Sequence, residues 1–135
     1  MSTYNKPLPI PNPITEPFWK AAKNHELLIQ HCTNCNEYIF PPREICPRCM
    51  SFNLEWVGAS GKGSIFCYTV VRVPPNPGFN AEVPYIVAIV ELDEGPHLMS
   101  NLINGKIEDI SLNMPVTVVF DDVTPEFSLV KFRPL

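Results

Sequence analysis

Residues 31–50 read HCTNCNEYIFPPREICPRCM and contain two Cys-x-x-Cys pairs separated by ten residues. A gap of two residues lets both thiolates of a pair bind one ion from a tight turn, so two such turns supply a tetrahedral set of four sulfurs. Four sulfur ligands are typical of zinc or iron centres. The spacing therefore predicts a small metal-stapled ribbon, and the predicted ligands are Cys32, Cys35, Cys46 and Cys49.

The predicted metal is structural. Four protein ligands leave no open coordination position, so we expect a zinc ion that holds the fold and takes no part in catalysis. A ribbon of this size has almost no hydrophobic core of its own. The free energy of metal binding, about 10–16 kcal/mol in comparable zinc-finger peptides, stabilises the fold in place of a core. Each turn favours a left-handed residue after its second cysteine, which suits Asn36, whereas the β-carbon of Met50 opposes that conformation.

Composition and charge set limits on the class of protein. The chain has 135 residues, of which 45% are hydrophobic and 18% charged, as expected for a globular protein with a real core. No apolar run reaches the ~18 residues of a membrane helix, and the N-terminus lacks the apolar core of a signal peptide, so we expect a cytoplasmic protein that binds no membrane. The net charge of −4 opposes partners bound mainly through phosphates, above all nucleic acid.

Residues 1–26 are predicted to form an extended proline-rich arm followed by a short helix. Prolines occupy alternate positions from 7 to 13, and each restricts its own φ and keeps the preceding residue extended. The helix is expected over residues 16–23, with Thr15 as its N-cap. Three side chains share one face and are interpreted as a core anchor: Phe18, Trp19 and Ala22.

The rest of the chain reads as β-structure in two parts. Short strands at 27–31, 38–40 and 54–57 place the zinc ribbon at residues 27–58. After a glycine-rich break, residues 59–135 contain five strand patterns, expected at 64–73, 84–92, 97–103, 115–123 and 127–132. A single helical turn at 107–112 falls between the third and fourth, which matches an OB-fold barrel. Cys67, within the first of these strands, is predicted to be a small core residue.

Further motifs occur in order along the chain: Pro17-Phe18-Trp19-Lys20, Leu27 to Cys32, Pro41-Pro42-Arg43, Cys46-Pro47-Arg48-Cys49, Glu55-Trp56, Ser60-Gly61-Lys62-Gly63 and Val70-Val71. With these motifs the chain resembles the zinc-ribbon plus OB-fold proteins associated with acyl-CoA enzymes, a family long catalogued as a domain of unknown function. The resemblance covers the chain from about Glu16 to its end. It implies a mainly β fold with a short N-terminal helix, a rubredoxin-like zinc ribbon and a five-stranded OB barrel.

The resemblance also implies a role. Members resemble non-catalytic partners of thiolases, thiolase-like lipid-transfer aldolases and hydroxymethylglutaryl-CoA synthase, and help to bind acyl-CoA. CoA requires cations for its phosphates, an apolar surface for adenine and a groove for its pantetheine arm. The candidate CoA-binding residues are Lys62, Arg43, Arg48, Arg72 and Phe79, with Phe66, Tyr68 and Tyr85 as further aromatic candidates.

Two of these candidates have a specific local context. Lys62 lies between glycines, where backbone N–H groups can also approach a phosphate. Phe79 ends a proline-rich loop at residues 74–79, between the first two barrel strands, where OB-folds often bind ligands. The sequence thus favours an accessory subunit that is not itself an enzyme, with acyl-CoA and a thiolase-fold or other acyl-CoA enzyme subunit as partners.

Other functions stay open at this stage. Zinc ribbons and OB-folds also bind single-stranded nucleic acid, although the acidic charge and the lack of a Lys/Arg run interleaved with aromatics weigh against it. An iron-loaded four-sulfur centre would indicate electron transfer. A homo-oligomer also stays open. An independent enzyme is least favoured, since no nucleophile–base pair or carboxylate pair stands out.

Overall fold

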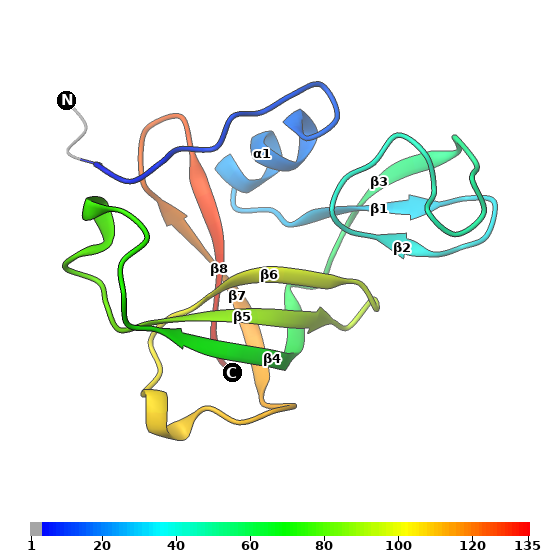
Figure 1. Cartoon of the computed structure of the whole chain (residues 1–135). Coiled ribbons are helices and arrows are strands. Elements are labelled where there is room, and N and C mark those ends of the chain that lie inside the picture. Colours follow the sequence, from blue (N-terminus) through cyan, green and yellow to red (C-terminus); the bar gives the residue numbers. More distant parts are fainter. Residues whose placement is uncertain (1–3) are drawn as a thin grey trace.

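The computed structural model describes residues 4–135, and residues 1–3, where the predicted arm begins, lie outside the described residues. A short helix, α1 (Glu16–Lys23), precedes two β-sheets (Figure 1). The first sheet has the strand order β2-β1-β3 and comprises β1 (Leu28–Cys32), β2 (Tyr38–Ile39) and β3 (Leu54–Gly58). Within residues 4–135, no helix is long and apolar enough to cross a bilayer.

The second sheet closes into a barrel with the strand order β4-β5-β6-β8-β7. Its strands are β4 (Lys62–Val71), β5 (Tyr85–Leu92), β6 (His97–Leu102), β7 (Pro115–Asp122) and β8 (Ser128–Pro134). Two 3₁₀ turns connect them, η1 (Pro77–Phe79) after β4 and η2 (Ile107–Asp109) after β6. The prediction of a mainly β protein with a short helix, a ribbon and a five-stranded OB barrel is confirmed.

One hydrophobic core joins the helix, the first sheet and the barrel. Phe18 from α1 and Ile29 from β1 pack in the same cluster as the fully buried barrel residues Val90 and Phe132. The Phe18 ring lies 5.0 Å from the Trp19 ring and 5.5 Å from the Phe40 ring, measured between centroids. The division into residues 1–26, 27–58 and 59–135 therefore stays a prediction, because packing runs across both boundaries.

The start of α1 corrects one expectation. Thr15 occupies the N-cap position, but its side chain makes no capping hydrogen bond to the helix. The Asn12 side chain instead accepts hydrogen bonds from the backbone N–H groups of Ile14 and Thr15, each at 2.9 Å. The Thr15 hydroxyl accepts from the Asn12 N–H at 3.0 Å. The Asn12 and Thr15 side chains thus form hydrogen bonds within the turn before the helix. Because the Thr15 hydroxyl bonds the Asn12 backbone, it does not cap α1.

The prediction that Cys67 is a core residue is wrong. A β-bulge between Ile65 and Cys67 adds Phe66 to β4, so that Ile65 pairs with Val90 while Cys67 pairs with Ile89. Ile65 is fully buried, and the extra residue shifts the alternation so that Cys67 is exposed on the outer face. A strand without the bulge would have put Cys67 on the same face as Ile65.

The N-terminal arm contacts the barrel at the loop between β4 and β5. The Lys6 ammonium lies 2.5 Å from a Glu82 carboxylate oxygen and 5.3 Å from the centre of the Phe79 ring. Further along the arm the apolar side chains face solvent, with Leu8 42% and Ile10 91% exposed. The arm is therefore attached at residues 4–7 and presents an apolar stretch beyond them.

Phe18 is the side chain that links all three parts of the core, so we expect Phe18→Ala to cost about 3–5 kcal/mol of unfolding free energy in urea. The loss combines reduced apolar burial with a cavity that the rigid barrel cannot fill. The matched control is Ile10→Ala, which removes an exposed side chain and should change the free energy by less than about 0.5 kcal/mol. Equal effects of the two substitutions would contradict this account of the core.

Candidate metal centre and binding groove

The four predicted metal ligands lie on two turns with matching backbone hydrogen bonds. In the first turn, the Cys32 carbonyl accepts from the Asn36 N–H at 2.8 Å, and in the second the Cys46 carbonyl accepts from the Met50 N–H at 2.9 Å. Asn36 and Met50 both adopt a left-handed conformation with φ of 65°. Met50 therefore adopts the conformation that its β-carbon opposes, because the turn requires the same geometry at both positions.

The sulfur positions fit a tetrahedral metal centre. All four ligand atoms lie within 4.8 Å of one another, and two of the distances, Cys32 Sγ to Cys49 Sγ and Cys35 Sγ to Cys46 Sγ, are 3.6 Å. A zinc–sulfur bond of about 2.3 Å separates the corners of a regular tetrahedron by about 3.8 Å. Cys32 and Cys46 are fully buried. The arrangement fits one structural Zn²⁺ with no open coordination position.

The electrostatics of the thiols show why a cation belongs there. The Glu37 backbone lowers the pKa of Cys35, but burial and the neighbouring sulfurs outweigh it and raise that pKa to about 12. The Asn34 side-chain amide, 3.4 Å from the sulfur, and the Ser51 backbone lower the pKa of Cys49 to about 6. Four thiols this close together do not all lose their protons readily, because the resulting thiolates repel one another. A bound divalent cation offsets this repulsion.

Removal of one ligand should abolish the centre. Cys32→Ser is expected to reduce the metal content measured by elemental analysis from about one zinc per chain to near zero, because the buried sulfur has no substitute. Cys67→Ser is the matched control, since Cys67 is exposed and lies outside the cluster. Full zinc retention in Cys32→Ser would contradict the assignment.

The left-handed conformation of Met50 predicts a stabilising substitution. A β-carbon in that conformation costs about 1–2 kcal/mol, and the Met50 side chain is 69% exposed, so little packing is lost on its removal. We expect Met50→Gly to stabilise the zinc-loaded protein by about 1 kcal/mol in chemical denaturation. Met50→Ala keeps the β-carbon and should change the stability by less than about 0.5 kcal/mol. Equal stabilities would contradict the strain argument.

Two predicted CoA-binding residues come together near the ribbon. Arg43 and Arg48 line a cavity of about 200 Å³ together with Phe40 and with Pro96 from the β5–β6 turn. The buried Gln30 side chain holds the Arg43 backbone, donating to its carbonyl at 2.8 Å and accepting from its N–H at 2.7 Å. Within residues 4–135, no carboxylate pairs with the Arg43 guanidinium.

The other three candidates lie elsewhere. Lys62 is the first residue of β4. The glycine that follows it allows close packing against β5, since a β-carbon on Gly63 would lie 2.4 Å from the Glu91 carbonyl oxygen. Arg72 and Phe79 follow the opposite end of β4, where the Phe79 ring stacks on Tyr85 at 5.5 Å. The structure therefore does not gather the five candidates at one site.

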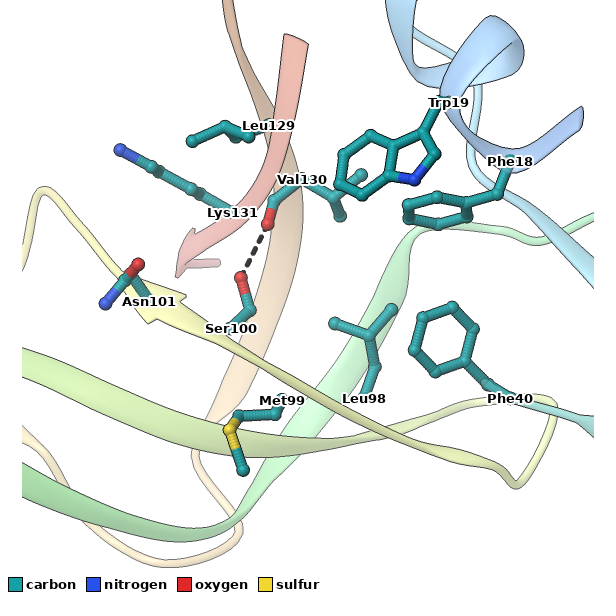
Figure 2. Close-up of a pocket in the computed structure, with 10 residues that line it drawn as sticks. All are labelled: Phe18, Trp19, Phe40, Leu98, Met99, Ser100, Asn101, Leu129, Val130 and Lys131. Carbon is teal, nitrogen blue, oxygen red and sulfur yellow. Dashed lines mark hydrogen bonds between the residues drawn. The ribbon is translucent and has the colours of Figure 1, made fainter. Parts of the chain in front are cut away.

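Sequence inspection did not find a groove between α1 and the barrel. It encloses about 340 Å³ and lies between β6 and β8. Figure 2 shows the Phe18, Phe40 and Leu98 side chains at one end and Lys131 at the other. The lining comes from segments far apart in the chain and from strand edges, so no local motif could have indicated it.

The fold and the sulfur cluster define a zinc-ribbon protein with an attached OB barrel. Comparison with known families agrees, because residues 19–55 match the rubredoxin-like zinc ribbon domain of ChsH2 and residues 56–121 match its C-terminal OB-fold domain. A DUF35 domain-containing scaffold protein of Methanocaldococcus jannaschii is 39% identical over 104 residues, which cover 76% of this chain and 73% of that protein. The chain belongs to the DUF35 family, whose members combine the zinc ribbon and OB-fold domains found in ChsH2.

Two further relatives are informative. A probable enoyl-CoA hydratase alpha subunit of Thermomonospora curvata is 42% identical over 118 residues, and this chain spans 36% of its length. Among solved structures, the Ltp2–ChsH2(DUF35) aldolase contains a chain with a TM-score of 0.85 and 39% identity, and the match covers 94% of this chain and 98% of that one. A DUF35-family protein from Sulfolobus solfataricus, at 16% identity and a TM-score of 0.67, shares the fold.

Proposed function

We propose that this protein is a non-catalytic accessory subunit that binds acyl-CoA and docks on a thiolase-like or related acyl-CoA enzyme. The observation that carries the proposal is the likeness to the DUF35 chain of the Ltp2–ChsH2(DUF35) aldolase, which extends over 94% of this chain. The relative from Thermomonospora curvata bears the name of a subunit of an enoyl-CoA hydratase. The first name associates a chain of this fold with an aldolase, and the second associates one with an enzyme of acyl-CoA substrates.

A non-catalytic role agrees with the chemistry of the side chains. The four cysteines leave a bound metal no open position for a substrate. One serine, aspartate and histidine come together, but the carboxylate of Asp122 stands between Ser128 and His25. Ser128 donates to that carboxylate and is fully buried, so the histidine has no access to its proton. This cluster ties the end of α1 to the barrel.

Arg43 and Arg48 are the favoured contacts for the CoA phosphates. They line one cavity, and guanidinium groups bind phosphates through charge-assisted hydrogen bonds. Glu37 pairs with Arg48, whereas Arg43 has no carboxylate partner among the described residues 4–135. Lys62, Arg72 and Phe79 lie away from this cavity and would contact other parts of the ligand or the partner enzyme.

Exposed apolar side chains support a partner. On the arm, Ile10 is 91% exposed. On the ribbon, Phe52 is 75% exposed and Met50 is 69% exposed. The arm and the ribbon are therefore the proposed docking surfaces, because a partner would remove these apolar side chains from water. We propose a cytoplasmic location for the complex.

Binding of single-stranded nucleic acid gains no support from the barrel. OB-folds bind nucleic acid across the second and third barrel strands, which here are β5 and β6. Neither strand contains a lysine or arginine, and their polar residues include Glu91 paired with His97. A surface of this kind offers phosphates no counter-charge.

Reversal of the charge at Arg43 should weaken binding of acetyl-CoA, measured by titration calorimetry, by about tenfold or more, because one charge-assisted contact contributes about 1.5–3 kcal/mol. Lys106→Glu is the matched control, since it makes the same charge change at an exposed position outside the cavity. Equal affinities for Arg43→Glu and Lys106→Glu would exclude this cavity as the phosphate site.

Affinity purification of the protein from its native host tests the proposal as a whole. A thiolase-fold or other acyl-CoA enzyme subunit should co-elute in near-equal amount, identified by mass spectrometry. A protein that recovers no such subunit and binds no acyl-CoA would refute the proposed function.

A further inference from the structure

The barrel is closed between β6 and β8 by one residue pair. These strands form a single parallel pair, Leu102 with Phe132, supported by a hydrogen bond of 2.8 Å from the Ile103 N–H to the Phe132 carbonyl. β5 and β6, by contrast, pair along the whole of β6. On the N-terminal side of this pair the two strands form no further backbone pairs, and the groove of about 340 Å³ lies between them (Figure 2).

Strand edges, as well as side chains, line this groove. Its walls include consecutive residues on both sides, Leu98 to Asn101 on β6 and Leu129 to Lys131 on β8. Side chains alternate between the faces of a strand, so a consecutive run faces a cavity through its backbone. The Ser100 hydroxyl crosses the gap and donates to the Val130 carbonyl at 2.6 Å. The groove thus offers backbone hydrogen-bonding groups between apolar walls.

Charge around the groove restricts the ligand. Lys131 lines its far end, but the Lys131 ammonium is 2.6 Å from an Asp121 carboxylate and its side chain is only 12% exposed. Lys6, beyond that end, is paired with Glu82 in the same way. These pairs neutralise the cations, so the groove suits an extended, uncharged chain that carries amide groups and not a phosphate.

The groove adjoins two other cavities. Phe40 lines both the groove and the cavity of Arg43 and Arg48. At the opposite end, Asn101, Leu129 and Lys131 also line a cavity of about 180 Å³ beneath the N-terminal arm. A cationic site, a neutral groove edged by strands and a further cavity therefore follow one another along β6.

We propose that the gap between β6 and β8 binds the pantetheine arm of acyl-CoA, with the phosphates toward Arg43 and Arg48 and the acyl group toward the cavity beneath the arm. The two amides of pantetheine hydrogen-bond to the strand edges on either side of the Ser100–Val130 hydrogen bond. Phe18, Phe40 and Leu98 cover its apolar carbons. This inference rests on the proposed function, and it assigns Phe79 to the wall of the acyl cavity, away from the adenine.

A pair of substitutions at Ser100 tests the proposal. Ser100→Phe fills the gap, whereas Ser100→Ala removes the same hydrogen bond and leaves the gap open. The probe is S-octanoyl-pantetheine, which lacks the nucleotide, and titration calorimetry measures its affinity. We expect Ser100→Phe to weaken binding at least tenfold, and Ser100→Ala to stay within about threefold of the unmodified protein.

Hydrogen exchange on the unmodified protein provides a measurement that does not depend on a variant. S-octanoyl-pantetheine should slow amide exchange at residues 98–101 and 129–131, and should leave the outer barrel strand residues 66–69 unchanged. Protection of those edges by a peptide of the partner enzyme, but not by S-octanoyl-pantetheine, would overturn the proposal.

The outcomes separate the two hypotheses. Octanoyl-CoA that binds Ser100→Phe and the unmodified protein equally, with no protection of β6, would overturn the pantetheine site and leave the accessory function intact. Octanoyl-CoA that binds neither the protein alone nor its complex with the partner enzyme would overturn both.

Discussion

Convergence of four sulfurs on one point is the constraint on which the rest of the structure depends. The ribbon's own buried cluster consists of Cys32, Ile39 and Cys46, far too little apolar surface to fold alone. A metal ion at the sulfurs holds β1 and β3 in register, and these strands carry Ile29 and Trp56 to the barrel. A metal at the sulfurs therefore also affects the core shared with the barrel, because it holds the strands that carry Ile29 and Trp56.

The shared core explains why the binding surfaces lie at junctions. Phe18 and Phe40 come from the helix and the ribbon, yet they pack beside the barrel and form one end of the groove. The arginine cavity likewise combines ribbon residues with Pro96 from the barrel. Neither part of the chain has these sites by itself, so a scaffold of this kind gains its ligand surface from the way its parts meet.

Local patterns were sufficient for the fold and for the cluster of four cysteines. Spacing of two residues within each cysteine pair dictates a turn, and alternation with turn residues dictates strands, so neither depends on distant contacts. Predictions failed where a distant partner decided. The bulge at Phe66, which lies in the pairing of β4 with β5, exposed Cys67. The arginine, lysine and aromatic candidates were found by residue type, which carries no information about their spatial grouping.

The sequence by itself thus determined the four-cysteine cluster, the strand count and the family, because each follows from short-range spacing or from motifs in order. Tertiary structure alone decided that Arg43 and Arg48 share a cavity and that Lys62 and Phe79 lie apart from it. It also decided the groove between β6 and β8. That groove exists because two strands distant in sequence pair at one residue position, a property of barrel closure that no segment contains.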